Sequence, residues 1–246
     1  MGHGPARLGG WTSSRARART PDPAPSPTWI ALARRALGLV RDGRRAILAI
    51  AGSPGAGKTT LARALVARVD ALAGAGTAAY VPMDGFHLAN ATLDRLGLHD
   101  RKGAIDTFDG WGVVALVRRL RAETEHAVYA PSFDRAVDEG VAGAIAVDPG
   151  RAPRRGRGQL PARRRRPVGA AGRAELDEAW FCATPADDRF ARLVERHTAG
   201  GRAPTAAEAW AREVDGANAA LIEGTRGRAD LVVDGTAAGV PEVVGP

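Results

Sequence analysis

The chain has 246 residues, of which 45% are hydrophobic, and a formal net charge of +8. This length suits one α/β domain with appendages, and the hydrophobic content allows a sizeable core. No run approaches the ~20 apolar residues of a transmembrane helix, and the amino terminus lacks an apolar signal-peptide core, so we expect no membrane insertion or secretion. The only cysteine, Cys182, can form no internal disulfide, and the expected location is a reducing cytoplasm.

The positive charge is concentrated in one segment. Residues 150–173 contain nine arginines and no acidic residue, so the rest of the chain carries a net charge of −1. That balance is ordinary for a globular protein, and the overall charge by itself does not predict a nucleic-acid partner.

The first predicted elements follow a stretch at 1–27 that is rich in Gly, Pro and Arg. Its few apolar side chains cannot offset the entropy of ordering, so we expect a disordered tail. Apolar residues at helical spacing predict a helix from a cap at Thr28 to Val40, ended by Gly43. A continuous apolar run at 46–51 predicts a buried parallel strand.

The remaining elements alternate between strands and helices. Further strands are predicted at 77–83, 178–183 and 230–234, and helices at 58–73, 111–122, 186–199 and 204–227. Such alternation predicts an α/β fold with a doubly wound, mostly parallel sheet and helices on both faces. We expect the domain to span 28–236, followed by a tail at 237–246.

A glycine-rich loop follows the first predicted strand. Residues 52–59 fit the pattern G-x-x-x-x-G-K-[ST] and stand between a strand and a helix, which predicts a P-loop NTPase. Successive N–H groups would surround a phosphate at the helix N-terminus. Lys58 would reach the β and γ phosphates, and the Thr59 hydroxyl would bind Mg²⁺. The residues expected to bind the nucleotide here are Gly52, Ser53, Pro54, Gly55, Ala56, Gly57, Lys58, Thr59 and Thr60.

An acidic residue ends the second predicted strand. Asp84 would face the ligand crevice, since this crevice lies at the carboxyl ends of the strands in an open α/β sheet. Its carboxylate could accept the proton of a substrate hydroxyl or lie near Mg²⁺. Taken alone, an Asp before Gly85 could equally begin a turn.

Four ordered segments together carry a family resemblance. The P-loop is followed by Asp-Gly-Phe-His at 84–87, by Arg-Lys-Gly at 101–103 with Phe-Asp five residues later, and by Tyr-Ala-Pro-Ser-Phe-Asp at 129–134. The sequence resembles the phosphoribulokinase/uridine kinase superfamily and is similar to its pantothenate-kinase-like branch over 46–148 and about 174–234. The resemblance implies ATP-dependent, Mg²⁺-assisted phosphoryl transfer to a small hydroxyl-bearing metabolite.

The resemblance also implies residue roles. Asp84 matches the catalytic base, acting with Lys58, and Arg101 and Lys102 match a basic pair near substrate or phosphate. His87 and Tyr129 are candidate substrate-pocket residues, with a helix-start histidine and a packed tyrosine as the alternatives.

A basic helix face predicts a lid. Arg189, Arg192 and Arg196 fall at i, i+3 and i+7, and the resemblance implies that 186–203 closes over ATP. A solvated basic face is the alternative, and the sequence does not choose a catalytic arginine. Asn218 could contact the base or only cap local structure.

Residues 149–172 depart from the resemblance, which implies a buried strand beside the P-loop strand and a Glu near Mg²⁺. Our hypothesis is a compensated frameshift. Codons allowed by residues 149–162, read one base out of register, can encode Pro-Val-Ala-Leu-Leu-Val-Val-Val-Glu-Gly-Asn-Tyr-Leu-Leu. A genuine basic insertion that binds nucleic acid is the alternative. As it stands, the segment would loop out, because each buried unpaired arginine costs several kcal/mol.

The sequence thus predicts a kinase with a nucleoside, pantothenate-like or sugar acceptor and a possible homodimer. One rival is a regulatory P-loop NTPase, and another is a catalytically impaired nucleotide-binding protein whose basic segment binds nucleic acid.

Overall fold

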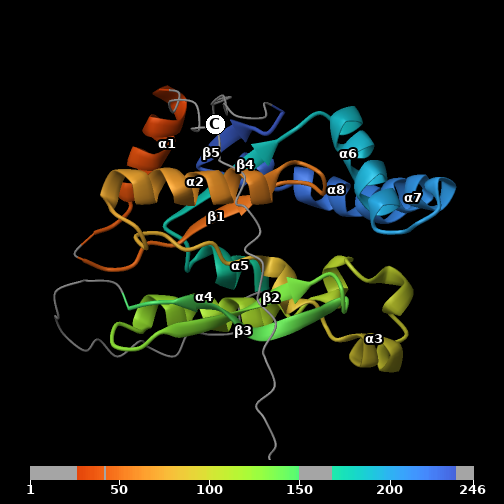
Figure 1. Cartoon of the computed structure of the whole chain (residues 1–246), viewed down its shortest axis with the longest axis horizontal. Helices are drawn as coiled ribbons and strands as arrows, with labels where there is room; N and C mark the ends of the chain where they lie inside the picture. Colours follow the sequence, from red (N-terminus) through yellow and green to blue (C-terminus); the bar gives the residue numbers. More distant parts are fainter. Residues whose placement is uncertain (1–26, 42, 150–167, 237–246) are drawn as a thin grey trace, which may run out of the picture.

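The computed structural model describes residues 27–41, 43–149 and 168–236. The predicted tails at 1–26 and 237–246, and most of the Arg-rich segment, lie outside these residues. The described chain forms two layers (Figure 1), with a parallel sheet and its helices in one and an antiparallel ribbon in the other.

The parallel sheet has the order β1-β4-β5 in the described part of the chain. Its strands are β1 (Leu48–Ala51), β4 (Glu178–Ala183) and β5 (Leu231–Asp234), which confirms three predicted strand positions. β1 pairs with β4, and β4 pairs with β5, both in parallel. The sheet packs against α1 (Pro27–Leu37) and α2 (Lys58–Ala73) around the buried side chains of Trp180, Cys182 and Val233. The α/β class of the fold is therefore confirmed.

The first helix differs slightly from its prediction. α1 starts at Pro27 and ends at Leu37, so Thr28 lies inside the helix and does not cap it. A proline is well suited to this first position, because its fixed φ is helical and its missing N–H would have no partner there.

The remaining helices have between 6 and 14 residues. They are α3 (Asn90–Leu96), α4 (Gly110–Ala122), α5 (Val168–Arg173), α6 (Ala186–Ala199), α7 (Pro204–Trp210) and α8 (Gly216–Glu223). The single helix predicted at 204–227 is confirmed from Pro204 to Glu223, where α7, a π-helical turn over Ala211–Asp215 and α8 follow one another without a non-helical residue. The turn buries Asp215, whose carboxylate lies 2.7 Å from the His197 ring in α6. The sequence did not predict this π-helical turn, and the contact between Asp215 and His197 lies at its last residue.

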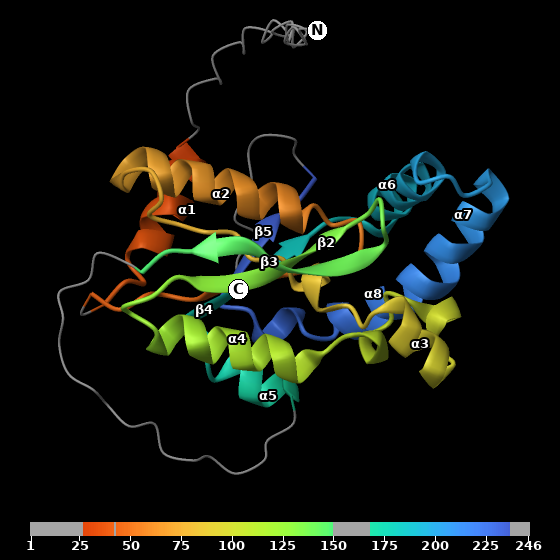
Figure 2. The ribbon, with the colours of Figure 1, turned by 60° about the horizontal axis from the view of Figure 1, so that its bottom comes forward.

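The second layer is an antiparallel ribbon that the prediction missed. β2 (Val128–Asp134) pairs with β3 (Glu139–Val147), and α4 packs beside them through Leu120, Val128 and Val147. Figure 2 shows the ribbon crossing in front of the parallel sheet.

The strand predicted at 77–83 is also wrong. The structure has turn and irregular backbone there, followed by a short 3₁₀ helix over Met83–Phe86. A strand needs a hydrogen-bonded neighbour, and β1 pairs only with β4 among the described residues. Apolar sequence alone therefore does not make this segment a strand.

No helix in the described ranges is long and apolar enough to cross a membrane.

Candidate active site

The loop between β1 and α2 has the backbone that phosphate binding requires. Gly52 and Gly55 have φ values of 146° and 78°, in a region that side chains rarely adopt. A Cβ atom at Gly52 would lie 2.6 Å from the carbonyl oxygen of Cys182, and one at Gly55 would lie 2.7 Å from that of Arg189. Glycine is thus required by both φ and space, and the loop leads directly into the N-terminus of α2.

Lys58 is the first residue of α2 and carries the main positive charge at the loop. Its Nζ donates to the Ser53 carbonyl oxygen at 3.0 Å, so the side chain lies over the loop. Burial lowers the pKa of Lys58, the carboxylate of Asp84 opposes this shift, and Arg196 and Arg189 add to the lowering. Lys58, Asp84 and Arg196 all line the cavity beside the loop.

The loop rests on polar side chains from three other elements. Ser53 is fully buried, and its hydroxyl donates to Glu223 Oε1 of α8 at 2.5 Å. The Cys182 thiol and the Thr184 hydroxyl both donate to the Ala56 carbonyl oxygen, at 2.9 and 3.0 Å. Burial raises the pKa of the Cys182 thiol to about 11, against smaller opposing effects of Lys58 and Arg192.

The three arginines of α6 have different surroundings. Arg189 donates to the Thr184 carbonyl oxygen at 3.0 Å, and Arg192 donates to the carbonyl oxygens of Gly55 and Gly235 at 3.3 and 3.2 Å. Arg192 thus fixes α6 against the loop, whereas Arg189 bonds to the connection between β4 and α6. Arg196 instead lines the cavity beside the loop, is 45% exposed, and lies 3.9 Å from an Asp215 carboxylate oxygen. Of the three, Arg196 is the arginine that lines the cavity.

Asp84 lies in the 3₁₀ turn over Met83–Phe86 and is exposed to solvent. The turn packs tightly on the ribbon, because a Cβ atom at Gly85 would lie 2.6 Å from the carbonyl group of Pro131 in β2. The ring of His87 lies 4.0 Å from the ring of Phe108 and 4.9 Å from that of Phe133, centroid to centroid. His87 Nδ1 lies 2.7 Å from the Asp84 carbonyl oxygen, which can only accept, so Nδ1 carries the proton.

The two residues of the basic pair differ in position: Arg101 lies at the surface and Lys102 lines the cavity. Arg101 is exposed and forms an ion pair with Asp106 at 3.2 Å. The Lys102 side chain is only 11% exposed, and its Nζ contacts Asn90 Oδ1 at 2.6 Å, Asp138 Oδ2 at 2.8 Å and the Asp138 carbonyl oxygen. Lys102 therefore clamps the loop before α4 to the β2–β3 turn.

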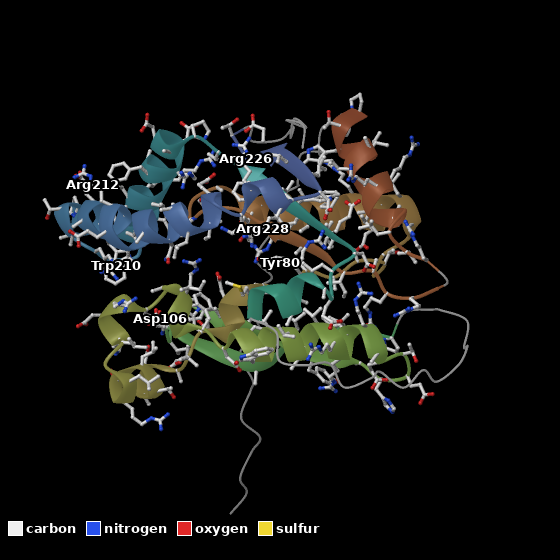
Figure 3. All side chains as sticks on the ribbon, turned by 180° about the vertical axis from the view of Figure 1, so that it is seen from behind. Tyr80, Asp106, Trp210, Arg212, Arg226 and Arg228 are labelled. Atoms are coloured by element: carbon white, nitrogen blue, oxygen red, sulfur yellow. The ribbon has the colours of Figure 1, made fainter. Side chains whose placement is uncertain are left out.

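Three further predicted residues differ in their position relative to this site. Asn218 Nδ2 donates to the Gly103 carbonyl oxygen at 2.9 Å, which ties α8 to the loop that holds Lys102. Thr59 is exposed, and its Oγ1 lies 3.5 Å from the hydroxyl of Tyr80, a residue visible between the two layers in Figure 3. Tyr129 is 58% exposed and does not line the cavity.

A cavity of about 4030 Å³ is lined by residues of both layers. It is lined on one side by Lys58, Thr59 and Arg196, and on the other by Asp84 and His87. The geometry thus brings a phosphate loop, a cationic helix and an exposed carboxylate to one space.

The described residues contain no group of three His, Cys, Asp or Glu side chains that could hold a metal ion by themselves. Mg²⁺ in phosphate sites is often held by one or two protein oxygens together with phosphates and waters. The exposed Thr59 hydroxyl and Asp84 carboxylate beside the loop fit that type of binding.

The comparisons with known proteins agree with this geometry. No protein-family model matches the chain. The ATP-dependent kinase-like protein notR' of Aspergillus versicolor is 39% identical over 134 residues, which cover 52% of this chain and 77% of that protein. The crystal structure of a putative fructose transport system kinase from Silicibacter sp. TM1040 shares 36% identity and a TM-score of 0.69, over 83% of this chain and 98% of that one.

The chain belongs to the uridine kinase/pantothenate kinase-like superfamily of P-loop kinases. A putative uridine kinase, C227.14, of Schizosaccharomyces pombe is 36% identical over 119 residues, and a pantothenate kinase of Rhodopseudomonas palustris (strain TIE-1) is 40% identical over 76 residues. These matches cover 47% and 31% of this chain. The chain spans about half the length of the uridine kinase (51%) and 24% of the pantothenate kinase.

The sequence did not reveal the residues outside the phosphate loop that form hydrogen bonds with it. Glu223, Cys182 and Thr184 contact it only because α8 and the end of β4 lie beside it in the fold. For Cys182 and Thr184 a signal was available, since the end of a strand parallel to the P-loop strand reaches the same edge of the sheet. Glu223 had no comparable signal.

Proposed function

We propose that this protein transfers the γ-phosphoryl group of ATP to a hydroxyl group of a small metabolite. The observation that carries the proposal is the placement of Lys58 and Asp84 at one cavity, with electrostatic coupling between them. A phosphate-binding loop alone would suit any nucleotide-binding protein. A carboxylate across the cavity from the loop adds a group that can act on a second substrate.

In this proposal the layer with the phosphate loop would bind ATP, and the layer with the ribbon would bind the acceptor. The glycine-rich loop and Lys58 would hold the β and γ phosphates through backbone N–H groups and the ammonium charge. The loop is preorganised, because Glu223, Cys182 and Thr184 hold it through hydrogen bonds. A loop that is already in its binding geometry loses little conformational entropy when phosphate binds.

Asp84 would accept the hydrogen bond of the acceptor hydroxyl and orient its oxygen toward the γ phosphate. Phosphoryl transfer depends chiefly on positioning and charge stabilisation, so one exposed carboxylate is sufficient for this role. Mg²⁺, held by Thr59 and the phosphates, would supply further neutralisation of phosphate charge. Arg196 would approach the γ phosphate from α6, since it lines the cavity while Arg189 and Arg192 bond to backbone oxygens.

The acceptor would lie on the side of the ribbon. His87 offers an aromatic face and a ring nitrogen, Nε2, that is free to accept a hydrogen bond when Nδ1 carries the proton. Phe108 and Phe133 line the same cavity. Aromatic faces with a few polar groups suit nucleoside, pantothenate-like and sugar acceptors alike, and Lys102 would shape this pocket through its clamp on the β2–β3 turn.

One observation favours a second candidate, a protein that binds ATP but turns over slowly. In the described residues β1 has a strand on one edge only, and the segment that leads to Asp84 is irregular between 77 and 82. Asp84 would then be held less firmly than a catalytic group requires, because a displacement of about 1 Å can cost a factor of roughly 100 in rate.

The test separates nucleotide binding from transfer. Binding of ATP with Mg²⁺ to the full chain is measured by isothermal titration calorimetry, and ADP release is then followed with a panel of nucleosides, pantothenate-like compounds and sugars. We expect Lys58→Ala to abolish ATP binding. We expect Asp84→Asn to keep ATP binding and to lower turnover about 10²–10⁴-fold, the range of a lost general base.

Arg119→Ala is the matched control, because Arg119 is exposed on α4 and does not line the cavity. Equal ATP affinity in the wild type, Lys58→Ala and Arg119→Ala would overturn the assignment of the phosphate site. ATP binding without turnover on any acceptor would favour the second candidate.

A further inference from the structure

We infer that Asp215, the last residue of the π-helical turn, is a positioning residue for Arg196 and directs its guanidinium group toward the γ phosphate of bound ATP. The inference rests on the proposed function in so far as ATP is the ligand of the phosphate loop. It deepens that function, because it identifies the group that orients the α6 arginine at the phosphate site.

The carboxylate of Asp215 lies at a place where packing does not require a charge. Ala207, Ala211 and Asp215 are buried at positions four residues apart, so they follow one buried face of a continuous helical stretch. α6 packs against α7 and against the π-helical turn, at one end of the upper layer (Figure 1). Burial at this face requires only an apolar side chain, and a buried carboxylate costs free energy unless it is paired. The partners of this carboxylate therefore indicate what it does.

The two oxygens of the carboxylate have different partners. Oδ2 lies 2.7 Å from Nε2 of His197, and Oδ1 lies 3.9 Å from a terminal guanidinium nitrogen of Arg196. An ionised carboxylate only accepts hydrogen bonds, so Nε2 carries the proton of the His197 ring. The His197 side chain is only 15% exposed, so this contact is largely shielded from water. One oxygen is thus fixed by a hydrogen bond, and the other is directed toward Arg196.

The contact with Arg196 is an attraction without a hydrogen bond. A separation of 3.9 Å is beyond hydrogen-bonding range. The carboxylate therefore restricts the directions of a flexible side chain but leaves its N–H groups for a ligand. Arg189 and Arg192 differ in this respect, because their N–H groups donate to backbone oxygens of the protein.

Both members of this ion pair lie close to the phosphate loop. Arg196 and Asp215 line the cavity, as do His197 and Lys58. Burial is the main cause that lowers the pKa of Lys58, and the charge of Arg196 adds to the lowering, so the two cations are close to each other. Such cations repel, and the carboxylate of Asp215 opposes the displacement of Arg196 that this repulsion favours. The arginine is thus held near the phosphate site before a nucleotide binds.

The same helical stretch also contacts the acceptor side of the cavity. Three residues after Asp215, Asn218 donates to the Gly103 carbonyl oxygen at 2.9 Å. Gly103 follows Lys102, which contacts the β2–β3 turn. Asp215 therefore has support from α6 on one side and from the acceptor-side loop on the other. A charge-stabilising group needs such support, since a displacement of about 1 Å can cost a factor of roughly 100 in rate.

The experiment is a double-mutant cycle on the full chain with Asp215→Asn and Arg196→Ala. The dissociation constants of ATP and of ADP, each with Mg²⁺, are measured by isothermal titration calorimetry. Their ratio reports contact with the γ phosphate, because ADP lacks this group. Urea denaturation shows whether each variant folds. Glu213→Gln is the matched control, since it neutralises an exposed carboxylate of the same turn that does not line the cavity.

We expect Arg196→Ala to reduce the preference for ATP over ADP about 10-fold or more, and Asp215→Asn to reduce it about 3–10-fold. In the Arg196→Ala background, Asp215→Asn should change the preference by less than about 2-fold, because the residue that it positions is gone. Glu213→Gln should stay within about 2-fold of the wild type. Asp215→Glu keeps the charge but moves it by one methylene group. It should also reduce the preference, and it completes the cycle if Asp215→Asn does not fold.

Three results would overturn the inference. The first is an unchanged preference in a folded Asp215 variant, since a purely structural role would weaken ATP and ADP alike. The second is an equal reduction with and without Arg196, because the carboxylate would then act by another route. The third is a wild-type preference in Arg196→Ala. None of these measurements needs an acceptor, so absence of turnover on every acceptor would count against the proposed function while the cycle still decides the role of Asp215.

Discussion

The buried thiol beneath the phosphate loop predicts how stability depends on pH. Cys182 is fully buried at the end of β4 and donates to the Ala56 carbonyl oxygen at 2.9 Å. Burial raises the pKa of this thiol from 9.0 to about 11. The folded protein therefore keeps the proton at pH values where the unfolded chain has lost it.

The sign and size of the effect follow from this difference. A raised pKa in the folded state contributes stability that is complete below about pH 9 and is lost as the pH rises toward about 11. The full contribution is about 2–3 kcal/mol, and about half of it is lost at pH 10. For a chain of this length, a loss of about 1.4 kcal/mol lowers the melting temperature by roughly 3–6 °C.

The assay compares the wild type with Cys182→Ser in urea at pH 8 and pH 10, with reductant present. Serine keeps a donor for the Ala56 carbonyl oxygen but does not ionise in this range. We expect the wild type to lose about 1.4 kcal/mol of unfolding free energy relative to Cys182→Ser between the two pH values. A difference that stays constant from pH 8 to pH 10 would refute the argument, because the thiol would then have the same pKa in both states.

Two further predictions concern the contacts that position α6 and Asp84. Asp215→Ala removes the 2.7 Å contact with His197 in a buried site, and we expect it to lower the unfolding free energy by about 1–3 kcal/mol, measured by urea denaturation. Gly85→Ala places a Cβ atom 2.6 Å from the Pro131 carbonyl group, and we expect a loss of about 1–3 kcal/mol together with lower turnover at unchanged ATP affinity.

Each of these variants has a matched control. Glu208→Ala removes an exposed ion pair with Arg212 on α7, and we expect a change below about 0.5 kcal/mol. Gly227→Ala adds a Cβ atom with nothing within 4 Å, and we expect it to leave stability and turnover nearly unchanged. If Asp215→Ala is no more destabilising than Glu208→Ala, the buried contact with His197 does not hold the π-helical turn. If Gly85→Ala behaves like Gly227→Ala, the turn at Asp84 is not fixed by the ribbon.

The local patterns of the chain were sufficient to predict the phosphate loop and its flanking elements. Its glycines, Lys58 and Thr59 stand in a fixed order between an apolar run and a helical pattern, and all of these features are encoded within 46–73. The strands β4 and β5 were predictable for a similar reason, because each is a short apolar run. Such elements depend little on what lies next to them in space.

The tertiary structure decided which of the predicted site residues share one cavity. The spacing of the α6 arginines was visible in the sequence, but only the fold shows that Arg189 and Arg192 bond to backbone oxygens while Arg196 lines the cavity. Likewise, Lys102 is held by Asn90 and Asp138, which are distant along the chain.

The wrong prediction of a strand at 77–83 has a direct physical cause. Its apolar residues predicted a strand, yet a strand is defined by backbone hydrogen bonds to a neighbour, and a sequence does not reveal whether that neighbour is present. Beside β1 the described chain offers none on this edge, so the segment remains irregular. The sequence by itself determined the phosphate loop and the strand and helix that flank it, because these depend on local patterns. Only the tertiary structure decided the pairing of strands and the partners of charged side chains, because both depend on groups far apart in the chain.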